Sequence, residues 1–307
     1  MTDIRPYIHD DVLGYAPNPG FCGPGVWDKM HTIDAEGLRS TGERPASREG
    51  PILAVGDSYT YGDEVSDEET WPAQLQKLTG RPVLNGGVTG YGFDQIVLRT
   101  EQLVARHNPS LVIMGFITDD LRRTEARRMW WRNKPWFAIE NDQLVLKGVP
   151  VPNRLSLPPR IRTWIEAGLS RLPEVLQHLV GYHVRVHPSG FGLAIAQRLT
   201  ERLGRLQAER GIRIVLMAQY PPTVWEHRAE ANEQRRCMQA LFHAAAACGI
   251  ATLDIYPRLA TEPKPLAYYQ SWHMNARGNL MVARLLAATL PGLLAGEEAR
   301  NDVTASR

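Results

Sequence analysis

Short apolar runs alternate along the chain with longer stretches in which apolar residues recur at helical spacing. The runs lack polar alternation and have the length of strands that are buried on both faces of a sheet. They occupy residues 51–55, 82–84, 110–116, 212–218 and 250–255. Helical spacing is found over residues 68–78, 93–107, 233–248 and 276–290. This alternation predicts an α/β protein in which five parallel strands are joined by helical crossovers that cover both faces of one sheet.

Two segments fall outside this alternation and set the predicted domain boundaries. Residues 1–47 are rich in proline, glycine and polar residues, which predicts an irregular or hairpin N-terminal extension. Residues 122–188 are too long for an ordinary crossover after the third strand. The sheet domain is then expected to comprise 48–121 and 189–296, and residues 297–307 to form a flexible tail.

The long segment at 122–188 has a pattern of its own. Two apolar stretches flank the polar residues 140–142, which predicts a β-hairpin over 136–146. An amphipathic helix is expected over 161–179, split or kinked at Pro173. Because the segment follows a strand end, where α/β proteins bind ligands, we expect it to cover the substrate.

Composition narrows the class of partner. The chain has 35 Lys+Arg against 33 Asp+Glu, so no overall field favours nucleic acid or an anionic membrane, and a small-molecule partner is expected. Three cysteines without CxxC spacing predict neither a disulfide framework nor a zinc site. The charged N-terminus has no apolar signal region, and no apolar stretch has the length of a membrane span. These features predict a cytoplasmic protein; they do not predict its oligomeric state.

A serine and a histidine lie at positions where they could meet. Ser58, in Gly-Asp-Ser-Tyr-Thr-Tyr-Gly, follows the first strand directly, at the sheet edge where α/β proteins place their chemistry. His273 precedes the last helix, with Asn275 as its expected N-cap, and histidine is the usual general base for a hydroxyl nucleophile. The alternatives are a strand-to-helix turn with a capping serine and a loop histidine bonded to backbone.

As a set, four motifs resemble the SGNH (GDSL-type) hydrolases. GDSYTYG, NGGVTGYG, FITDDL and HMNARG look like blocks I, II, III and V of that family, in the expected order, and the resemblance covers 51–121 and 213–295. It implies a flavodoxin-like three-layer sandwich and acyl-ester chemistry without a cofactor or metal. In that scheme Ser58 is the nucleophile, His273 is the base, and the backbone N–H groups of Ser58 and Gly90 form part of the oxyanion hole.

The sequence departs from the family pattern at two positions. Where block III has an asparagine that donates to the oxyanion, this chain has Asp119. An ionised carboxylate cannot donate, so either Asp119 is protonated, or Thr118 donates instead, or the site is not built for an oxyanion. Where block V has the aspartate that orients the histidine, this chain has Gln270. A glutamine carbonyl could hold the imidazole tautomer without supplying charge, and Asp254 or Asp119 could supply that charge. The resemblance favours a third alternative, a Ser-His dyad, because some members of the family work without a side-chain acid.

Three further patterns in the sequence are open to more than one interpretation. The glycines between 86 and 92 lack the GxGxxG spacing, which favours a tight turn over a phosphate site. His183 and His187 are separated by β-branched residues and precede a proline, which argues against a helical metal site. The arginines and tryptophans at 122–136 predict either a solvated helix face with buried aromatics or a lid for an anionic or ring-shaped substrate. The candidate substrate-binding residues are Asp57, Tyr59, Tyr91, Arg122, Arg123 and Trp272.

Together these features predict a serine hydrolase that acts on a carboxylic ester, such as a short acyl group on a sugar or small metabolite. Two alternatives remain open at this point. The acyl-enzyme could pass its acyl group to a hydroxyl or amine acceptor, as in an acyltransferase. The two departures could instead indicate a catalytically impaired binding protein.

Overall fold

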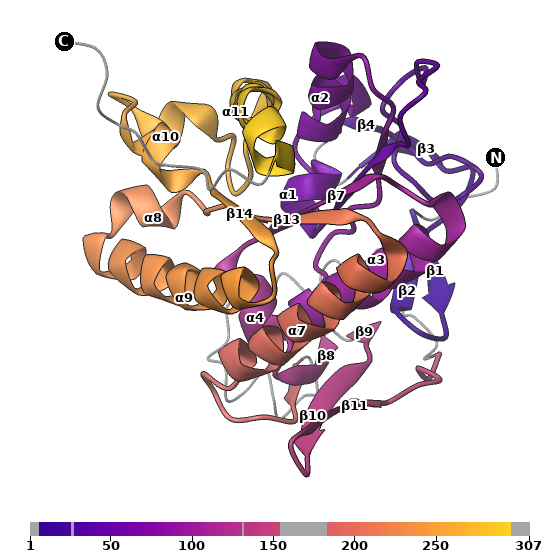
Figure 1. Ribbon diagram of the computed structural model, residues 1–307, viewed down its shortest axis with the longest axis vertical. Coiled ribbons are helices and arrows are strands. Elements are labelled where there is room, and N and C mark those ends of the chain that lie inside the picture. The colour runs from indigo at the N-terminus through magenta and orange to yellow at the C-terminus, as the bar shows by residue number, and fades with distance from the viewer. Residues whose placement is uncertain (1–5, 26–27, 131, 154–182, 296–307) are drawn as a thin grey trace.

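The computed structural model describes residues 6–25, 28–130, 132–153 and 183–295. At its centre lies a parallel sheet with the strand order β14-β13-β7-β5-β6, which confirms the predicted five-stranded α/β architecture (Figure 1). The strands are β5 (Ile52–Val55), β6 (Val83–Asn85), β7 (Leu111–Phe116), β13 (Arg213–Ala218) and β14 (Ala251–Asp254). Every residue of β5 and β7 is buried, as continuous apolar runs require when helices cover both faces of a sheet.

Helices cover the sheet on both faces, so the sandwich has three layers of the flavodoxin type (Figure 1). α2 (Trp71–Thr79) packs against α11 (Ala276–Ala295) on one face. The other face carries α3 (Phe93–His107), α7 (Gly192–Arg210) and α9 (Arg228–Ala247). The shorter helices are α1 (Ser58–Tyr61), η1 (Asp67–Glu69), α4 (Thr118–Arg123), α8 (Thr223–Glu226), α10 (Tyr256–Ala260) and η2 (Pro265–Tyr268).

The N-terminal residues form two hairpins that pack on the sheet domain. The first pairs β1 (Tyr7–Asp10) with β2 (Gly14–Pro17), and the second pairs β3 (Cys22–Pro24) with β4 (Met30–Thr32). The extension is anchored by Arg39, which is only 1% exposed and donates to the carbonyls of Tyr61, Gly62 and Val65. The N-terminal extension therefore contacts the loop that follows α1.

The segment after α4 folds into two small antiparallel sheets. β8 (Ala126–Met129) lies between β9 (Arg132–Asn133) and β12 (Val184–Arg185), and the predicted hairpin forms from β10 (Trp136–Glu140) and β11 (Gln143–Lys147). The helix expected over 161–179 and the tail over 297–307 lie outside the described residues.

A buried lysine ties this segment to the sheet domain. Lys134 donates to Asp94 of α3 over 2.5 Å, and both side chains are almost fully enclosed. Beside it, β9 contacts β2, so the insertion also packs against the N-terminal hairpin. Within the described ranges, no helix is long and apolar enough to cross a lipid bilayer.

Candidate active site

The turn from β5 into α1 presents Ser58 at the carboxyl end of the sheet. A side chain on Gly56 would meet Thr60 Oγ1 at 2.2 Å and the Gly115 carbonyl at 2.5 Å, so only glycine fits at this turn. Asp57 caps α1 by accepting the Tyr59 N–H over 2.9 Å. Ser58 is the first residue of the helix and is 5% exposed.

His273 meets this serine, as the sequence predicts. Its Nε2 lies 2.8 Å from Ser58 Oγ, which is within range for proton transfer. The loop that carries the imidazole is closed by the Gln270 N–H, which donates to the His273 carbonyl over 2.9 Å. Asn275 accepts the Gly278 N–H over 3.0 Å and so caps the start of α11, as expected.

Glu64, which no motif in the sequence singles out, lies against the other imidazole nitrogen. Its Oε1 is 3.3 Å from His273 Nδ1, and its side chain is fully buried. The same carboxylate accepts the backbone N–H groups of Ser271, Trp272 and His273 and the Ser271 hydroxyl. Gly62, with φ of +87°, ends α1 and turns the chain so that Glu64 reaches the histidine loop.

The charges of this pair follow from its surroundings. Burial alone would raise the pKa of Glu64, but hydrogen bonds from His273, Ser271 and Trp272 outweigh it and lower the pKa to about 2. Burial alone would lower the pKa of His273, but the hydrogen bond to Glu64 and the nearby carboxylates Asp63 and Asp57 raise it above the usual histidine value. Glu64 is therefore a carboxylate at neutral pH and stabilises a protonated imidazole.

The residues that were expected to orient the histidine lie elsewhere. Gln270 is exposed, and what it contributes to the loop is its backbone N–H. Asp254 accepts the Tyr256 N–H over 2.8 Å at the end of β14, on the far side of the sheet from β5. The structure thus places Glu64, rather than Gln270 or Asp254, against Nδ1. A sequence signal did exist, since Glu64 is an acidic residue only six positions after the serine, beyond a helix-ending glycine.

The two backbone N–H groups that the family resemblance assigns to the oxyanion hole are those of Ser58 and Gly90. The Tyr91 N–H donates to the Val88 carbonyl over 3.3 Å and closes the turn in which Gly90 has φ of +76°. In the part of the chain that the structure describes, neither the Ser58 N–H nor the Gly90 N–H donates to a protein acceptor. Such unpaired N–H groups at a helix N-terminus and a tight turn can stabilise an oxyanion.

The block III position carries no side-chain donor. Asp119 is ion-paired with Arg122 on the exposed side of α4. The Thr118 hydroxyl donates to Gln234 of α9 over 2.8 Å and is therefore already engaged. The ion pair offsets the negative charge that Asp119 would otherwise bring to the site, but neither side chain replaces the amide of an asparagine.

Four of the six candidate substrate-binding side chains are largely buried and make hydrogen bonds or ion pairs within the protein, namely Asp57, Tyr59, Tyr91 and Arg123. Arg123 lies between two buried carboxyl groups, 2.6 Å from Asp120 and 3.5 Å from Asp57, and burial raises the pKa of both acids. The Tyr59 hydroxyl donates to the Trp272 carbonyl over 2.6 Å, and the Tyr91 hydroxyl donates to the Tyr15 carbonyl. Of the six, only Arg122 and Trp272 have exposed side chains.

A model of the GDSL-like lipase/acylhydrolase family matches residues 54–280. The chain belongs to this family. It is accordingly an enzyme of the lipase and esterase type of acylhydrolase, and its sheet order is that of the SGNH hydrolase fold. No curated protein matches its sequence.

Several solved structures resemble this GDSL-family chain at low identity. TesA is 15% identical, with a TM-score of 0.46, and the match covers 79% of this chain and 99% of TesA. LAE5, an α/β hydrolase from the metagenome of Lake Arreo in Spain, is 13% identical, with a TM-score of 0.49 and coverage of 80% and 96%. The lipase/acylhydrolase from Enterococcus faecalis is 13% identical, with a TM-score of 0.45 and coverage of 79% and 96%.

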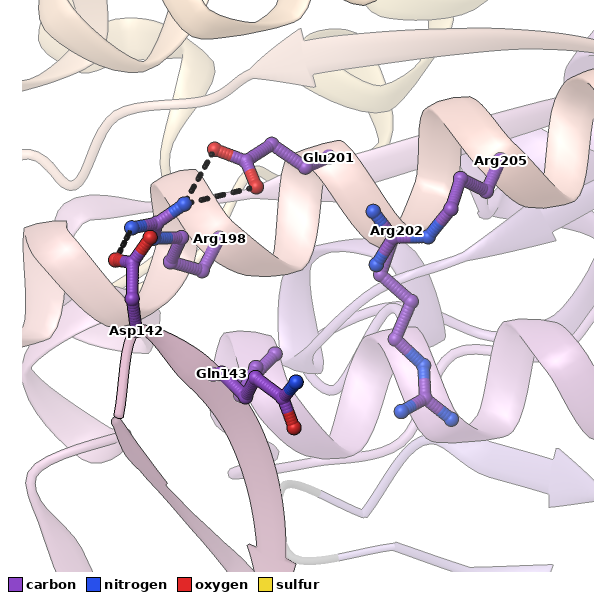
Figure 2. A pocket seen from close by; sticks show the side chains of 7 residues that line it. Asp142, Gln143, Arg198, Glu201, Arg202 and Arg205 are labelled. Carbon is purple, nitrogen blue, oxygen red and sulfur yellow. Dashed lines mark hydrogen bonds and ion pairs between the residues drawn. The ribbon is translucent and has the colours of Figure 1, made fainter. Parts of the chain in front are cut away.

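Hollows in the described part of this GDSL-family hydrolase lie both near the histidine and away from it. One, of about 290 Å³, is lined by Glu64 and by the loop residues Gln270 and Asn275 next to the histidine. The other, of about 320 Å³, lies between the β10–β11 hairpin and α7, and its lining includes neither Ser58 nor His273 (Figure 2). Most of its arginines are paired with acids. Arg198 is ion-paired with both Asp142 and Glu201, and Arg202 is ion-paired with Glu101.

The sequence also singled out two histidines as a weak metal candidate. His183 and His187 lie in bends on either side of β12 rather than on one face of a helix. No cluster of metal-ligating side chains occurs among the described residues.

Proposed function

We propose that the protein is a serine esterase in which Ser58, His273 and Glu64 form a catalytic triad. The observation that carries this proposal is the continuous line of contacts from Ser58 Oγ to His273 Nε2, at 2.8 Å, and from Nδ1 to Glu64, at 3.3 Å. Each contact lies in the order that nucleophile, base and orienting acid require. In this proposal Glu64 supplies the acid that is missing at Gln270, which was one of the two departures that favoured an impaired binding protein; the other, at Asp119, persists.

In the proposed reaction, His273 takes the proton of Ser58 as the serine oxygen attacks the ester carbonyl. Glu64 holds the imidazole and stabilises its protonated form, and the N–H groups of Ser58 and Gly90 bind the oxyanion. His273 then gives its proton to the leaving alcohol as the acyl-serine forms. Water, deprotonated by the same histidine, attacks the acyl-serine and releases the acid.

The exposed surface beside the triad favours a small acylated alcohol, such as a sugar or metabolite with a short acyl group. Trp272 is 62% exposed and precedes the catalytic histidine, so its indole offers a flat surface for a ring or an acyl chain. Arg122, whose side chain is 69% exposed, adds a hydrogen-bond donor on α4. An acyl-enzyme at this site could also transfer its acyl group to an alcohol, which product analysis distinguishes from hydrolysis.

The proposal is tested with a fluorophosphonate probe, which reacts covalently with an activated serine. Wild-type protein is expected to be labelled, Ser58→Ala not at all, and His273→Ala far more slowly. A wild-type protein that stays unlabelled while correctly folded would argue against a working nucleophile. Labelling of Ser58→Ala at the wild-type rate would place the reactive residue elsewhere.

A further inference from the structure

The peptide bond between Thr89 and Gly90 carries one of the two proposed oxyanion donors. It is the central peptide of the turn that the Tyr91 N–H closes on Val88, with Gly90 at the third position, where type II turns need a positive φ. The N–H and C=O of a central peptide take no part in closing the turn. The direction of the Gly90 N–H therefore depends on what holds this peptide from outside.

Tyr15, from strand β2 of the N-terminal hairpin, binds the carbonyl of this Thr89–Gly90 peptide. The phenol hydroxyl donates to the Thr89 carbonyl oxygen over 2.8 Å. In a trans peptide the C=O and N–H point in opposite directions, so a donor fixed on the Thr89 carbonyl directs the Gly90 N–H to the other side of the turn. A hydrogen bond accepted by the carbonyl also polarises the amide and makes its N–H a stronger donor.

The surroundings keep this contact in place. Tyr15 is 7% exposed, and burial raises the pKa of its phenol, so the hydroxyl keeps the proton that it donates. The Arg132 guanidinium lies 4.5 Å from the centre of the Tyr15 ring. A side chain at Gly90 would come within 2.7 Å of the Trp130 ring and 3.2 Å of the Tyr15 hydroxyl. The peptide is thus enclosed by the N-terminal extension and the insertion.

The geometry points to Tyr15 as a positioning residue of the oxyanion hole, whose hydroxyl orients and polarises the 89–90 peptide for catalysis. This inference rests on the proposed function. It explains how the site could work without the asparagine of block III. Because Asp119 is paired with Arg122, the oxyanion relies on backbone N–H groups, and the strength of the Gly90 donor matters more than it would beside an asparagine.

The test compares Tyr15→Phe with the matched control Tyr7→Phe. Tyr7 lies on the partner strand of the same hairpin and bonds the other oxygen of the same residue, Thr89 Oγ1, over 2.7 Å. We expect Tyr15→Phe to lower kcat/KM for p-nitrophenyl acetate about tenfold and to weaken inhibition by an aryl trifluoromethyl ketone by a similar factor, because both form an oxyanion. Inhibition by the unfluorinated ketone is expected to be unchanged. Tyr7→Phe is expected to stay within about twofold of wild type in every assay.

A second variant guards against a structural effect of the lost hydroxyl. Tyr15→4-aminophenylalanine keeps the ring and a weaker donor, and it is expected to recover part of the lost rate. The inference is overturned if Tyr15→Phe retains wild-type kcat/KM, if Tyr7→Phe loses as much, or if the amino variant recovers nothing. If one of these outcomes is observed while Ser58 still reacts with the fluorophosphonate, only the role of Tyr15 is refuted, and the proposed function stands. An unreactive wild type would instead overturn both.

Discussion

Replacing Glu64 with glutamine tests the acid of the proposed triad with almost no change in shape. Oε1 of the carboxylate accepts the Ser271 hydroxyl and the Trp272 N–H and lies 3.3 Å from His273 Nδ1, and Oε2 accepts two backbone N–H groups. A glutamine amide has only one acceptor oxygen, so its NH₂ group must face donors on one side. Glu64→Gln therefore removes the charge and also loosens the histidine loop.

The expected loss of activity is large. When the acid of a Ser-His-Asp triad becomes an amide, kcat falls by about 10⁴, because the imidazole loses its correct tautomer and the charge that stabilises its protonated form. For Glu64→Gln we expect a fall of about 10³ to 10⁴, which corresponds to about 4 to 5.5 kcal/mol of transition-state stabilisation.

The stability of the folded protein should change as well, with a defined pH dependence. The pKa of Glu64 falls from its ordinary value of 4.5 to about 2 on folding, which corresponds to at most about 3 kcal/mol. Since the folded-state pKa is the lower one, this stabilisation is complete above pH 4.5 and is lost as the pH falls towards 2. Glu64→Gln is therefore expected to be less stable than wild type at neutral pH and to approach it in acid.

The assay is steady-state hydrolysis of p-nitrophenyl acetate on the plateau of the pH profile, above the pKa of the histidine base. Urea unfolding of the same samples at neutral and acidic pH measures stability. Glu68→Gln serves as a control, because Glu68 is an exposed acid of the same segment. A folded Glu64→Gln protein that keeps kcat within about tenfold of wild type would refute the triad and leave a Ser-His dyad.

Three other predictions follow from the same contacts. The acid limb of the kcat/KM profile should titrate above the usual histidine pKa, because the folded-state pKa of His273 is raised and activity requires its neutral form; a limb below that value would contradict the site electrostatics. Asp119→Asn should raise kcat, by up to about 10², because it supplies a side-chain amide donor to the oxyanion. Gln270→Asp should change kcat by less than about threefold, because Glu64 already lies against His273 Nδ1. A larger gain from Gln270→Asp than from Asp119→Asn would contradict this assignment. Arg39→Lys should lower the free energy of unfolding, measured by urea titration, by about 2 kcal/mol or more, because an ammonium group cannot reach all the carbonyls that the guanidinium bonds. A loss of less than about 0.5 kcal/mol would refute the anchoring role of Arg39.

The sequence predicts the sheet and the reactive pair well, for a local reason. Each strand is a continuous apolar run, and Ser58 directly follows the carboxyl end of β5, where α/β proteins place their chemistry. His273 comes from the loop before α11, so its motif rather than a strand end predicts it. Both residues also lie in short motifs that resemble the family, and the family match over residues 54–280 confirms the resemblance.

The acid and the oxyanion support were harder to predict, because both depend on contacts between distant segments. Glu64 reaches the imidazole only because Gly62 reverses the chain and Arg39 binds the carbonyls of that loop. Tyr15 bonds a residue 74 positions away, from an extension whose sequence predicts little regular structure. Apolar periodicity carries no information on such pairings, whereas the family pattern directed attention to Gln270.

The most direct test of the central claim is to trap the acyl-enzyme. Protein mixed with excess p-nitrophenyl acetate is quenched in acid within the first turnovers, digested, and analysed by mass spectrometry. We predict an acetyl group on the peptide that contains Ser58, formed at a rate no slower than turnover and greatly reduced in Glu64→Gln. Turnover without acetylated Ser58, or with the acetyl group on a different residue, would contradict the account.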